Sequence, residues 1–142
     1  MTKPSWAQFD RGIFLANVLG LVYNPKTKKL LIGRRKNDPY VKKLSWSFPG
    51  GRPTYGKSLE DSLVKEIKIK TGVKVKVRTI ILARIPKENK QFLLLYYLCE
   101  TNQTKIKAGE KFVEVKWIKP KEIQKYFKTS IHPQLLKFLK VL

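Results

Sequence analysis

Acidic residues are scarce in this chain of 142 amino acids, which has 10 Asp and Glu against 31 Lys and Arg. The resulting formal net charge of +21 raises the local concentration of polyanions around the protein. Any binding to nucleic acid is expected to weaken steeply with salt, because phosphates that are bound by lysines release their counterions. Two interpretations stay open at this point. The surface binds a polyanion such as RNA, or the lysines are simply solvated.

Cysteine and histidine occur once each, which limits the chemistry that the chain can perform. Cys99 has no partner for an intrachain disulfide, and a lone thiol in an apolar run suits a reducing cytoplasm. His132 has no second histidine or cysteine with which to form a zinc site, so we expect it at a turn or a helix cap. No Gly-x-Ser-x-Gly motif is present, so acyl transfer has no support.

Long apolar runs are also missing, and none approaches the roughly 18 to 20 residues that a membrane-spanning helix needs. Residues 1–11 lack the continuous apolar stretch of a secretory signal. We therefore expect a cytoplasmic protein that has no membrane partner. Internal repeats and low-complexity linkers are absent too, and the length suits one compact core, so we predict a single domain over residues 1–142.

The apolar pattern predicts strands at residues 13–23, 29–34, 44–48, 73–78, 91–99 and 112–118. Turns or polar loops are expected at 24–27, 37–40 and 87–90. One helix is predicted from an N-cap at Ser58 to a C-cap at Gly72, and shorter helical segments at 121–127 and 133–142. This order predicts an α+β fold with a mixed sheet rather than a doubly wound parallel sheet.

Residues 48–73 resemble the box of the Nudix hydrolase family, written G-x5-E-x7-R-E-U-x-E-E-x-G-U, where U is a bulky aliphatic residue. Gly51 takes the first position, and Gly72 and Val73 close the frame at the expected spacing. The positions between them depart from the pattern: Lys57 replaces the first glutamate, Lys65 the arginine, and Ile69 and Lys70 the last two glutamates, while Glu66 matches. Segments 31–35, 46–51 and 114–118 also resemble the family's flanking strands. The resemblance implies a mixed β-sheet sandwiched between helices.

The resemblance further implies hydrolysis of a nucleoside diphosphate derivative, with Mg²⁺ or Mn²⁺ held by the glutamates of the box. Magnesium prefers several hard oxygen ligands at near-octahedral geometry. On a helix, positions 66, 69 and 70 lie at i, i+3 and i+4, so three carboxylates there would converge, but only Glu66 is present. The ammonium of Lys70 would repel a dication at a few ångströms. We therefore expect the metal site to be lost or strongly weakened.

Two alternatives concern the remaining acids. In the first, Glu66 is the catalytic residue and holds a weakly bound metal together with Glu110, because magnesium carried by a diphosphate needs only one or two carboxylates. In the second, Glu66 binds no metal and forms an ion pair with Lys70 at i+4.

In a second interpretation, the lysines of the predicted helix and the glycine-rich loop beside it bind an anion directly. The candidate nucleotide-binding residues are Gly50, Gly51, Arg52, Tyr55, Lys57, Lys65 and Lys70. The alternative is that the lysines are one solvated helix face.

Three functions follow as hypotheses. The first is a Nudix-like protein that binds a nucleotide diphosphate or a nucleic-acid phosphate with little or no hydrolysis. The second is a divergent Nudix hydrolase that uses Mg²⁺ or Mn²⁺. The third is a scaffold component of a ribonucleoprotein. A homodimer is expected from the family alone.

Overall fold

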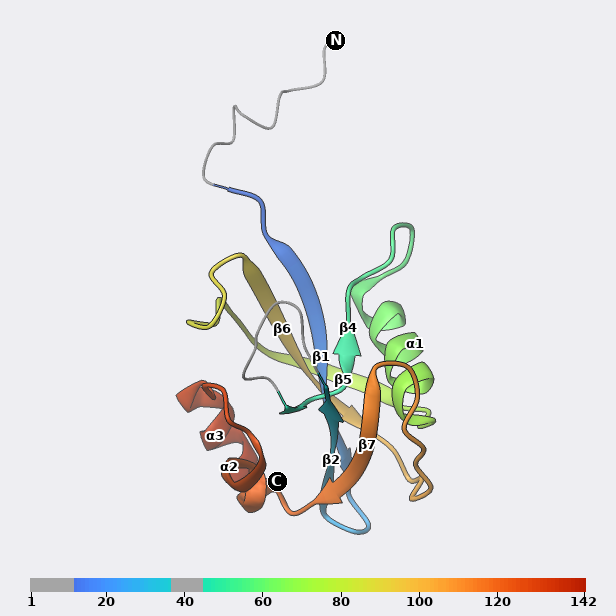
Figure 1. The fold of residues 1–142 in the computed structure, drawn as a ribbon. Coiled ribbons are helices and arrows are strands. Elements are labelled where there is room, and N and C mark those ends of the chain that lie inside the picture. Colours follow the sequence, from blue (N-terminus) through green and yellow to red (C-terminus); the bar gives the residue numbers. More distant parts are fainter. Residues whose placement is uncertain (1–11, 37–44) are drawn as a thin grey trace.

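The strands and helices follow one another in an order close to the predicted one. The computed structural model describes residues 12–36 and 45–142. Its elements are β1 (Leu15–Asn24), β2 (Lys29–Arg35), β3 (Trp46–Ser47), β4 (Gly50–Gly51), α1 (Leu59–Thr71), β5 (Lys76–Arg84), β6 (Phe92–Glu100), β7 (Phe112–Ile118), the 3-10 turn η2 (Pro120–Glu122), α2 (Ile123–Tyr126) and α3 (Pro133–Lys140) (Figure 1).

Strand β1 organises the sheet, because three other strands pair with it. It runs parallel to β6 and antiparallel to β2 and β4. Strand β5 pairs antiparallel with the outer side of β6, and β7 and β3 pair antiparallel with β2. Parallel and antiparallel pairs therefore coexist, which confirms the predicted mixed sheet.

Both faces of the sheet are covered by helices. Successive side chains of each strand point to opposite faces, so neighbouring residues of one strand pack against different helices. Tyr97 packs on the same face as Leu63 and Ile67 of α1. Its neighbour Tyr96 packs on the other face, with Leu135 and others from the C-terminal helices. Figure 1 shows α1 on one side of the sheet and α2 with α3 on the other. The predicted sandwich of a sheet between helices is confirmed.

Helix α1 begins and ends where the capping residues predict. The Ser58 hydroxyl accepts a hydrogen bond from the Asp61 amide at 3.0 Å. At the other end, Gly72 has a φ of 74°, in the left-handed region, and its amide donates to the Lys68 carbonyl. Glycine suits this position because it has no Cβ to strain. The cap pair thus fixes which residues of the box are helical.

One predicted strand was wrong in extent, and one predicted helical segment differs in kind. The strand predicted at 73–78 is β5 and begins only at Lys76, where pairing with Glu100 starts. Val73 and Val75 precede it and are both buried in the core beside α1. The helical segment predicted at 121–127 is confirmed within one residue at each end, but its first turn is the 3-10 turn η2 and only the four residues of α2 are α-helical.

The strand predicted at 44–48 is shorter than expected, since β3 contains only Trp46 and Ser47. Position 44 and the predicted loop at 37–40 lie outside the described residues. Within residues 12–36 and 45–142, no helix has the length and apolar character needed to cross a membrane.

Candidate functional site

The backbone of β4 lies unusually close to its neighbours, which explains its two glycines. A Cβ at position 50 would lie 2.0 Å from the Val18 carbonyl oxygen of β1. A Cβ at position 51 would lie 2.9 Å from the carboxyl carbon of Glu66 on α1. A side chain at position 50 would force the two strand backbones apart, and one at position 51 would displace the Glu66 side chain. The Gly50 carbonyl and the Glu66 carboxylate therefore face one small space.

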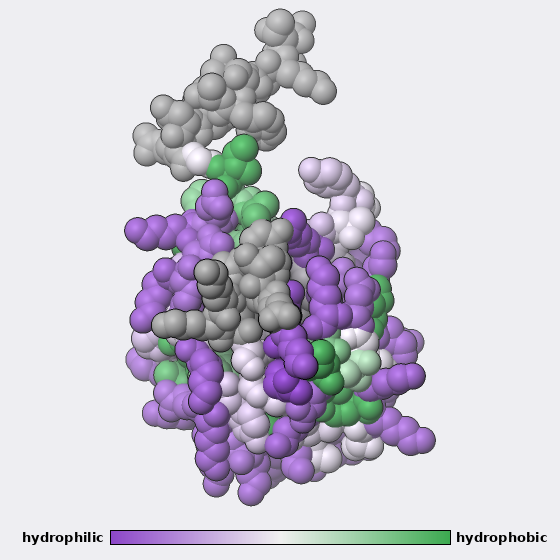
Figure 2. Space-filling model, in the orientation of Figure 1, coloured by the Kyte–Doolittle hydropathy of each residue, from purple (hydrophilic) through white to green (hydrophobic). Residues whose placement is uncertain are grey.

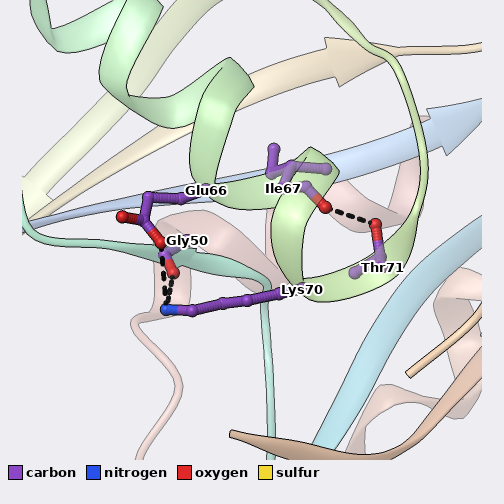
Figure 3. A network of polar contacts seen from close by, with 5 residues as sticks. All are labelled: Gly50, Glu66, Ile67, Lys70 and Thr71. Carbon is purple, nitrogen blue, oxygen red and sulfur yellow. Dashed lines mark hydrogen bonds and ion pairs between the residues drawn. The ribbon is translucent and has the colours of Figure 1, made fainter. Parts of the chain in front are cut away.

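Lys70 of α1 fills that space with its ammonium group. Nζ donates to the Gly50 carbonyl oxygen at 2.5 Å and lies 3.5 Å from Oε2 of Glu66 (Figure 3). The side chain is buried, so the expected Glu66–Lys70 ion pair at i+4 is confirmed in a sheltered setting. Burial lowers the pKa of Lys70; Glu66 opposes this, while the charges of Arg35 and Lys111 lower the pKa further.

The segment before β7 brings further charged residues to the same place. The Lys107 amide donates to the Thr71 carbonyl at 3.0 Å, and the Gly109 amide donates to the Lys70 carbonyl at 2.9 Å. A Cβ at position 109 would lie 2.1 Å from the Ile69 carbonyl oxygen, so only glycine allows this approach. These contacts fix Glu110 and Lys111 beside the C-terminal half of α1.

A cavity of about 380 Å³ extends from Lys70 toward the other face of the sheet. Near Lys70 it is lined by charged residues and glycines: Arg35, Gly50, Gly51, Arg52, Glu66, Glu110 and Lys111. Elsewhere it is lined mainly by apolar and aromatic residues, including Leu19, Trp46, Phe48, Phe92, Leu94, Tyr96, Phe127 and Leu135. The cavity is thus cationic in one part and apolar in another, and its volume suits a small-molecule ligand.

A polar cluster closes the apolar part. The Glu88 carboxylate accepts two hydrogen bonds of 2.6 Å from the amide and the hydroxyl of Ser130. Arg84 donates to the Ser130 carbonyl at 2.8 Å and to the Tyr96 hydroxyl at 3.1 Å. Burial acts to raise the pKa of Glu88, but the hydrogen bonds from Ser130 outweigh it and the pKa is lowered. The cluster ties the loop after β5 to the segment before α3.

The predicted site residues divide into two groups. Those that line the cavity are Gly50, Gly51, Arg52, Glu66, Lys70 and Glu110. Tyr55, Lys57 and Lys65 do not line it and are exposed, and Tyr55 is at the tip of the loop between β4 and α1 with its side chain fully in solvent.

Sequence reasoning missed the cavity residues Arg35 and Lys111, and also the Arg84–Glu88–Ser130 cluster. For Arg35 a signal existed, since it follows a predicted strand within a segment that resembles the family. His132 behaves as predicted, because it caps α3 and its Nδ1 accepts from the Gln134 amide at 3.0 Å.

The residues present do not fit a magnesium ion at Lys70. A divalent ion requires several oxygen ligands in the space that the Lys70 ammonium shares with Glu66 and the Gly50 carbonyl. In the part of the chain that the structure describes, no three His, Cys, Asp or Glu side chains are grouped to hold a metal. Glu66 and Glu110 line one cavity, but Glu66 is already neutralised by an internal cation.

Relatives of known name match parts of the chain. The mouse nucleoside diphosphate-linked moiety X motif 6 is 34% identical over 67 residues, which are 47% of this chain and 20% of that protein. The ADP-ribose pyrophosphatase of Methanocaldococcus jannaschii is 38% identical over 56 residues, 39% of this chain and 32% of that protein. The matched segments thus span no more than a third of these relatives.

Solved structures share the fold over most of the chain. A NUDIX hydrolase from Nitrosomonas europaea has a TM-score of 0.73 at 17% identity, with 91% of this chain and 72% of that chain covered. The NUDIX domain of Shewanella oneidensis NrtR, solved in complex with ADP ribose, has a TM-score of 0.71 at 17% identity, with 94% and 90% covered. The family model described as NUDIX domain matches residues 14–140. The chain therefore belongs to the NUDIX domain family.

Proposed function

We propose that the cavity binds a nucleoside diphosphate derivative without a divalent metal, and that the protein has little or no hydrolase activity. The observation that carries this proposal is the position of the Lys70 ammonium, between the Glu66 carboxylate and the Gly50 carbonyl. The lysine supplies, as a covalent part of the chain, a positive charge at the place where the family's box would hold a metal ion.

Competition between the lysine and a metal favours the lysine. A free dication has to displace the ammonium from two oxygen atoms or bind a few ångströms from it, where like charges in a partly desolvated site repel strongly. While Lys70 is protonated, its nitrogen has no free lone pair with which to coordinate a metal. The resemblance to the family implies hydrolysis by a water molecule that a metal activates. Such a water is therefore not expected here.

Cations gather around one end of the cavity and make it suitable for a diphosphate. Arg35, Arg52 and Lys111 line the cavity with Lys70, against the carboxylates of Glu66 and Glu110. A bound anion reduces the repulsion between like charges that are held close together, and one guanidinium group binds two phosphate oxygens at once. The pKa of Lys70, which Arg35 and Lys111 lower, is expected to rise when a diphosphate binds between them.

The apolar part of the same cavity suits the nucleoside. Phe48 makes edge contacts with Tyr96 and Phe127, with ring centroids 6.1 Å and 4.8 Å apart. An aromatic wall of this kind packs well against a base. ADP-ribose is the probe of choice, because one relative is named for its hydrolysis and one solved neighbour contains it.

The proposal is tested by isothermal titration calorimetry with ADP-ribose, in EDTA and then in excess Mg²⁺ or Mn²⁺. Binding is expected to be equal in EDTA and in metal. Lys70→Gln should weaken it about 10- to 100-fold, as expected for loss of a hydrogen bond from a charged group. The matched control is Lys65→Gln, which removes one charge from an exposed position of the same helix and should leave affinity unchanged.

The competing function is a divergent hydrolase that uses Glu66 and Glu110. Turnover of ADP-ribose in metal, abolished both by EDTA and by Glu66→Gln, would establish that function and refute the metal-free proposal. Binding that disappears in EDTA would refute it as well. Thermal unfolding of each variant shows whether a loss of binding comes from the site or from the fold.

A further inference from the structure

A second cavity, of about 620 Å³, lies between three segments that are distant in the sequence. They are the β1–β2 turn, the junction between β7 and η2, and the C-terminal end of α3. The segments lie together at the lower end of Figure 1, where Figure 2 shows mainly hydrophilic side chains. We call this cavity the basic groove; its lining is Thr27, Lys28, Lys29, Lys119, Pro120, Lys121, Ile123, Gln124, Leu136, Leu139, Lys140 and Leu142.

Five exposed lysines line the basic groove, and none of its described lining side chains is acidic. They are Lys28, Lys29, Lys119, Lys121 and Lys140. None of the five side chains forms an ion pair within residues 12–36 and 45–142. The nearest acid in the sequence, Glu122, accepts from the Lys119 backbone amide at 2.9 Å and pairs with Lys125 at 3.7 Å; of the five groove lysines, only Lys119 interacts electrostatically with it. The groove therefore has a concentrated positive charge with little internal compensation.

The β1–β2 turn holds its lysines in a defined arrangement. The buried Asn24 side chain accepts hydrogen bonds from the amides of Lys26 and Thr27 at 3.0 and 3.3 Å. Its amide group donates to the Gln103 carbonyl at 3.1 Å, which anchors the turn to the segment after β6. Lys28 adopts a φ of 57°, so the chain reverses tightly there. Cations on such an ordered scaffold lose less conformational entropy on binding than cations on a loose tail.

The floor of the groove distinguishes between possible polyanions. Ile123 and Leu139 are buried, and Leu136 and Leu142 are only partly exposed, so the groove lacks the fully exposed apolar face that insertion into a lipid surface requires. None of the described lining residues is aromatic, so there is no platform on which bases stack. A ligand recognised here is bound through repeated backbone charge. We propose that the basic groove binds the phosphodiester backbone of a nucleic acid, independently of its sequence.

Fluorescence anisotropy with a short, labelled, mixed-sequence single-stranded RNA tests this proposal as a function of salt. Five phosphate contacts predict a slope of about −3.5 in log K against log salt, or about a hundredfold loss between roughly 50 and 200 mM. The groove variant Lys28→Gln, Lys119→Gln, Lys121→Gln should have a slope of about −1.4 and a loss of about sevenfold. Its matched control is Lys74→Gln, Lys76→Gln, Lys90→Gln, which lowers the net charge equally at exposed positions outside the groove.

The proposal stands if the control keeps the slope of the parent protein and the groove variant does not. Equal changes in both triple variants would assign RNA binding to overall charge and overturn it. Absence of RNA binding with capture by anionic lipid vesicles would overturn it in favour of a membrane. ADP-ribose binding measured on the same groove variant should be unchanged, so failure of this proposal and failure of the nucleotide proposal are distinguishable.

Discussion

Replacing Ile69 and Lys70 together with glutamate is expected to convert the Lys70 position into a divalent-metal site. Ile69 is 40% exposed, so a carboxylate there costs little packing. Position 70 is buried, and a glutamate there loses the contact with Gly50 and lies near the carboxylate of Glu66. Three carboxylates at i, i+3 and i+4 then share one face of α1 beside the Gly50 carbonyl, which is an oxygen set that magnesium accepts.

The size of the effect follows from the ion pair that is lost. Removing one partner of a largely buried pair costs about 3 to 5 kcal/mol. For a chain of this length, that corresponds to a fall in Tm of about 12 to 20 °C in EDTA. A metal at about a hundred times its Kd returns about 2.7 kcal/mol. The Tm of the double variant should therefore rise by about 10 °C in saturating metal, while the parent protein stays nearly unchanged.

Differential scanning fluorimetry in EDTA, Mg²⁺ and Mn²⁺ measures these shifts. The control is Ile69→Gln with Lys70→Gln, which removes the ammonium without adding carboxylates and should not respond to metal. A metal-dependent rise of similar size in the parent would refute the reasoning, because it would mean that Lys70 does not exclude the ion. No rise in the double variant would refute it as well, since the space would then not be a cation site.

Three further predictions concern single residues. Gly109→Ala should lower the urea midpoint of unfolding by the equivalent of about 1 to 3 kcal/mol, because its Cβ would meet the Ile69 carbonyl; an unchanged midpoint would contradict the close approach. Burial raises the pKa of Cys99 to about 12 from an ordinary 9.0, so near pH 8 its thiolate population is about a thousandfold smaller. Iodoacetamide should therefore label it at least that much more slowly in folded than in urea-unfolded protein, and equal rates would refute this. Glu88→Gln should destabilise the protein at neutral pH, because the pKa of Glu88 is lowered and its contribution is present above the ordinary carboxylate pKa. That difference in stability should vanish as the pH falls through the folded pKa; a difference that persists there would contradict the role of the Ser130 hydrogen bonds.

The parts of the fold that were predictable from the sequence depend on local chemistry. Ser58 and Gly72 specify the ends of α1 through hydrogen bonds that span only a few residues. The beginning of β5 was not predictable in this way. Val73 and Val75 alternate with lysines as strand residues do, yet they are buried before pairing with β6 begins, and only the tertiary structure decides where two strands first meet.

The same distinction applies to the site. The place of Lys70 at a metal-ligand position of the box was predictable, because it is a matter of spacing, and the proposed exclusion of metal rests on it. The partner of its ammonium was not, because the Gly50 carbonyl is 20 residues away and becomes adjacent only through the pairing of β4 with β1. Conversely, Lys57 and Tyr55 lie within the box in sequence, but the β4–α1 loop holds both in solvent. Arg35 and Lys111 reach the cavity from segments that the box pattern does not include.

The presence of Glu66 is not by itself a sign of metal chemistry, because this residue has a structural role that requires no metal. Its carboxylate pairs with Lys70, and its side chain packs where a Cβ on Gly51 would collide with it. A loss of function in Glu66→Gln alone is therefore ambiguous, since the substitution removes a possible metal ligand and also the partner of a buried ammonium. The combination Glu66→Gln with Lys70→Met resolves the ambiguity. If Glu66 serves only to hold Lys70, the second substitution should recover part of the stability lost in the first and, with it, the lost function, whereas a glutamate that also binds metal leaves the function lost although Lys70→Met restores stability.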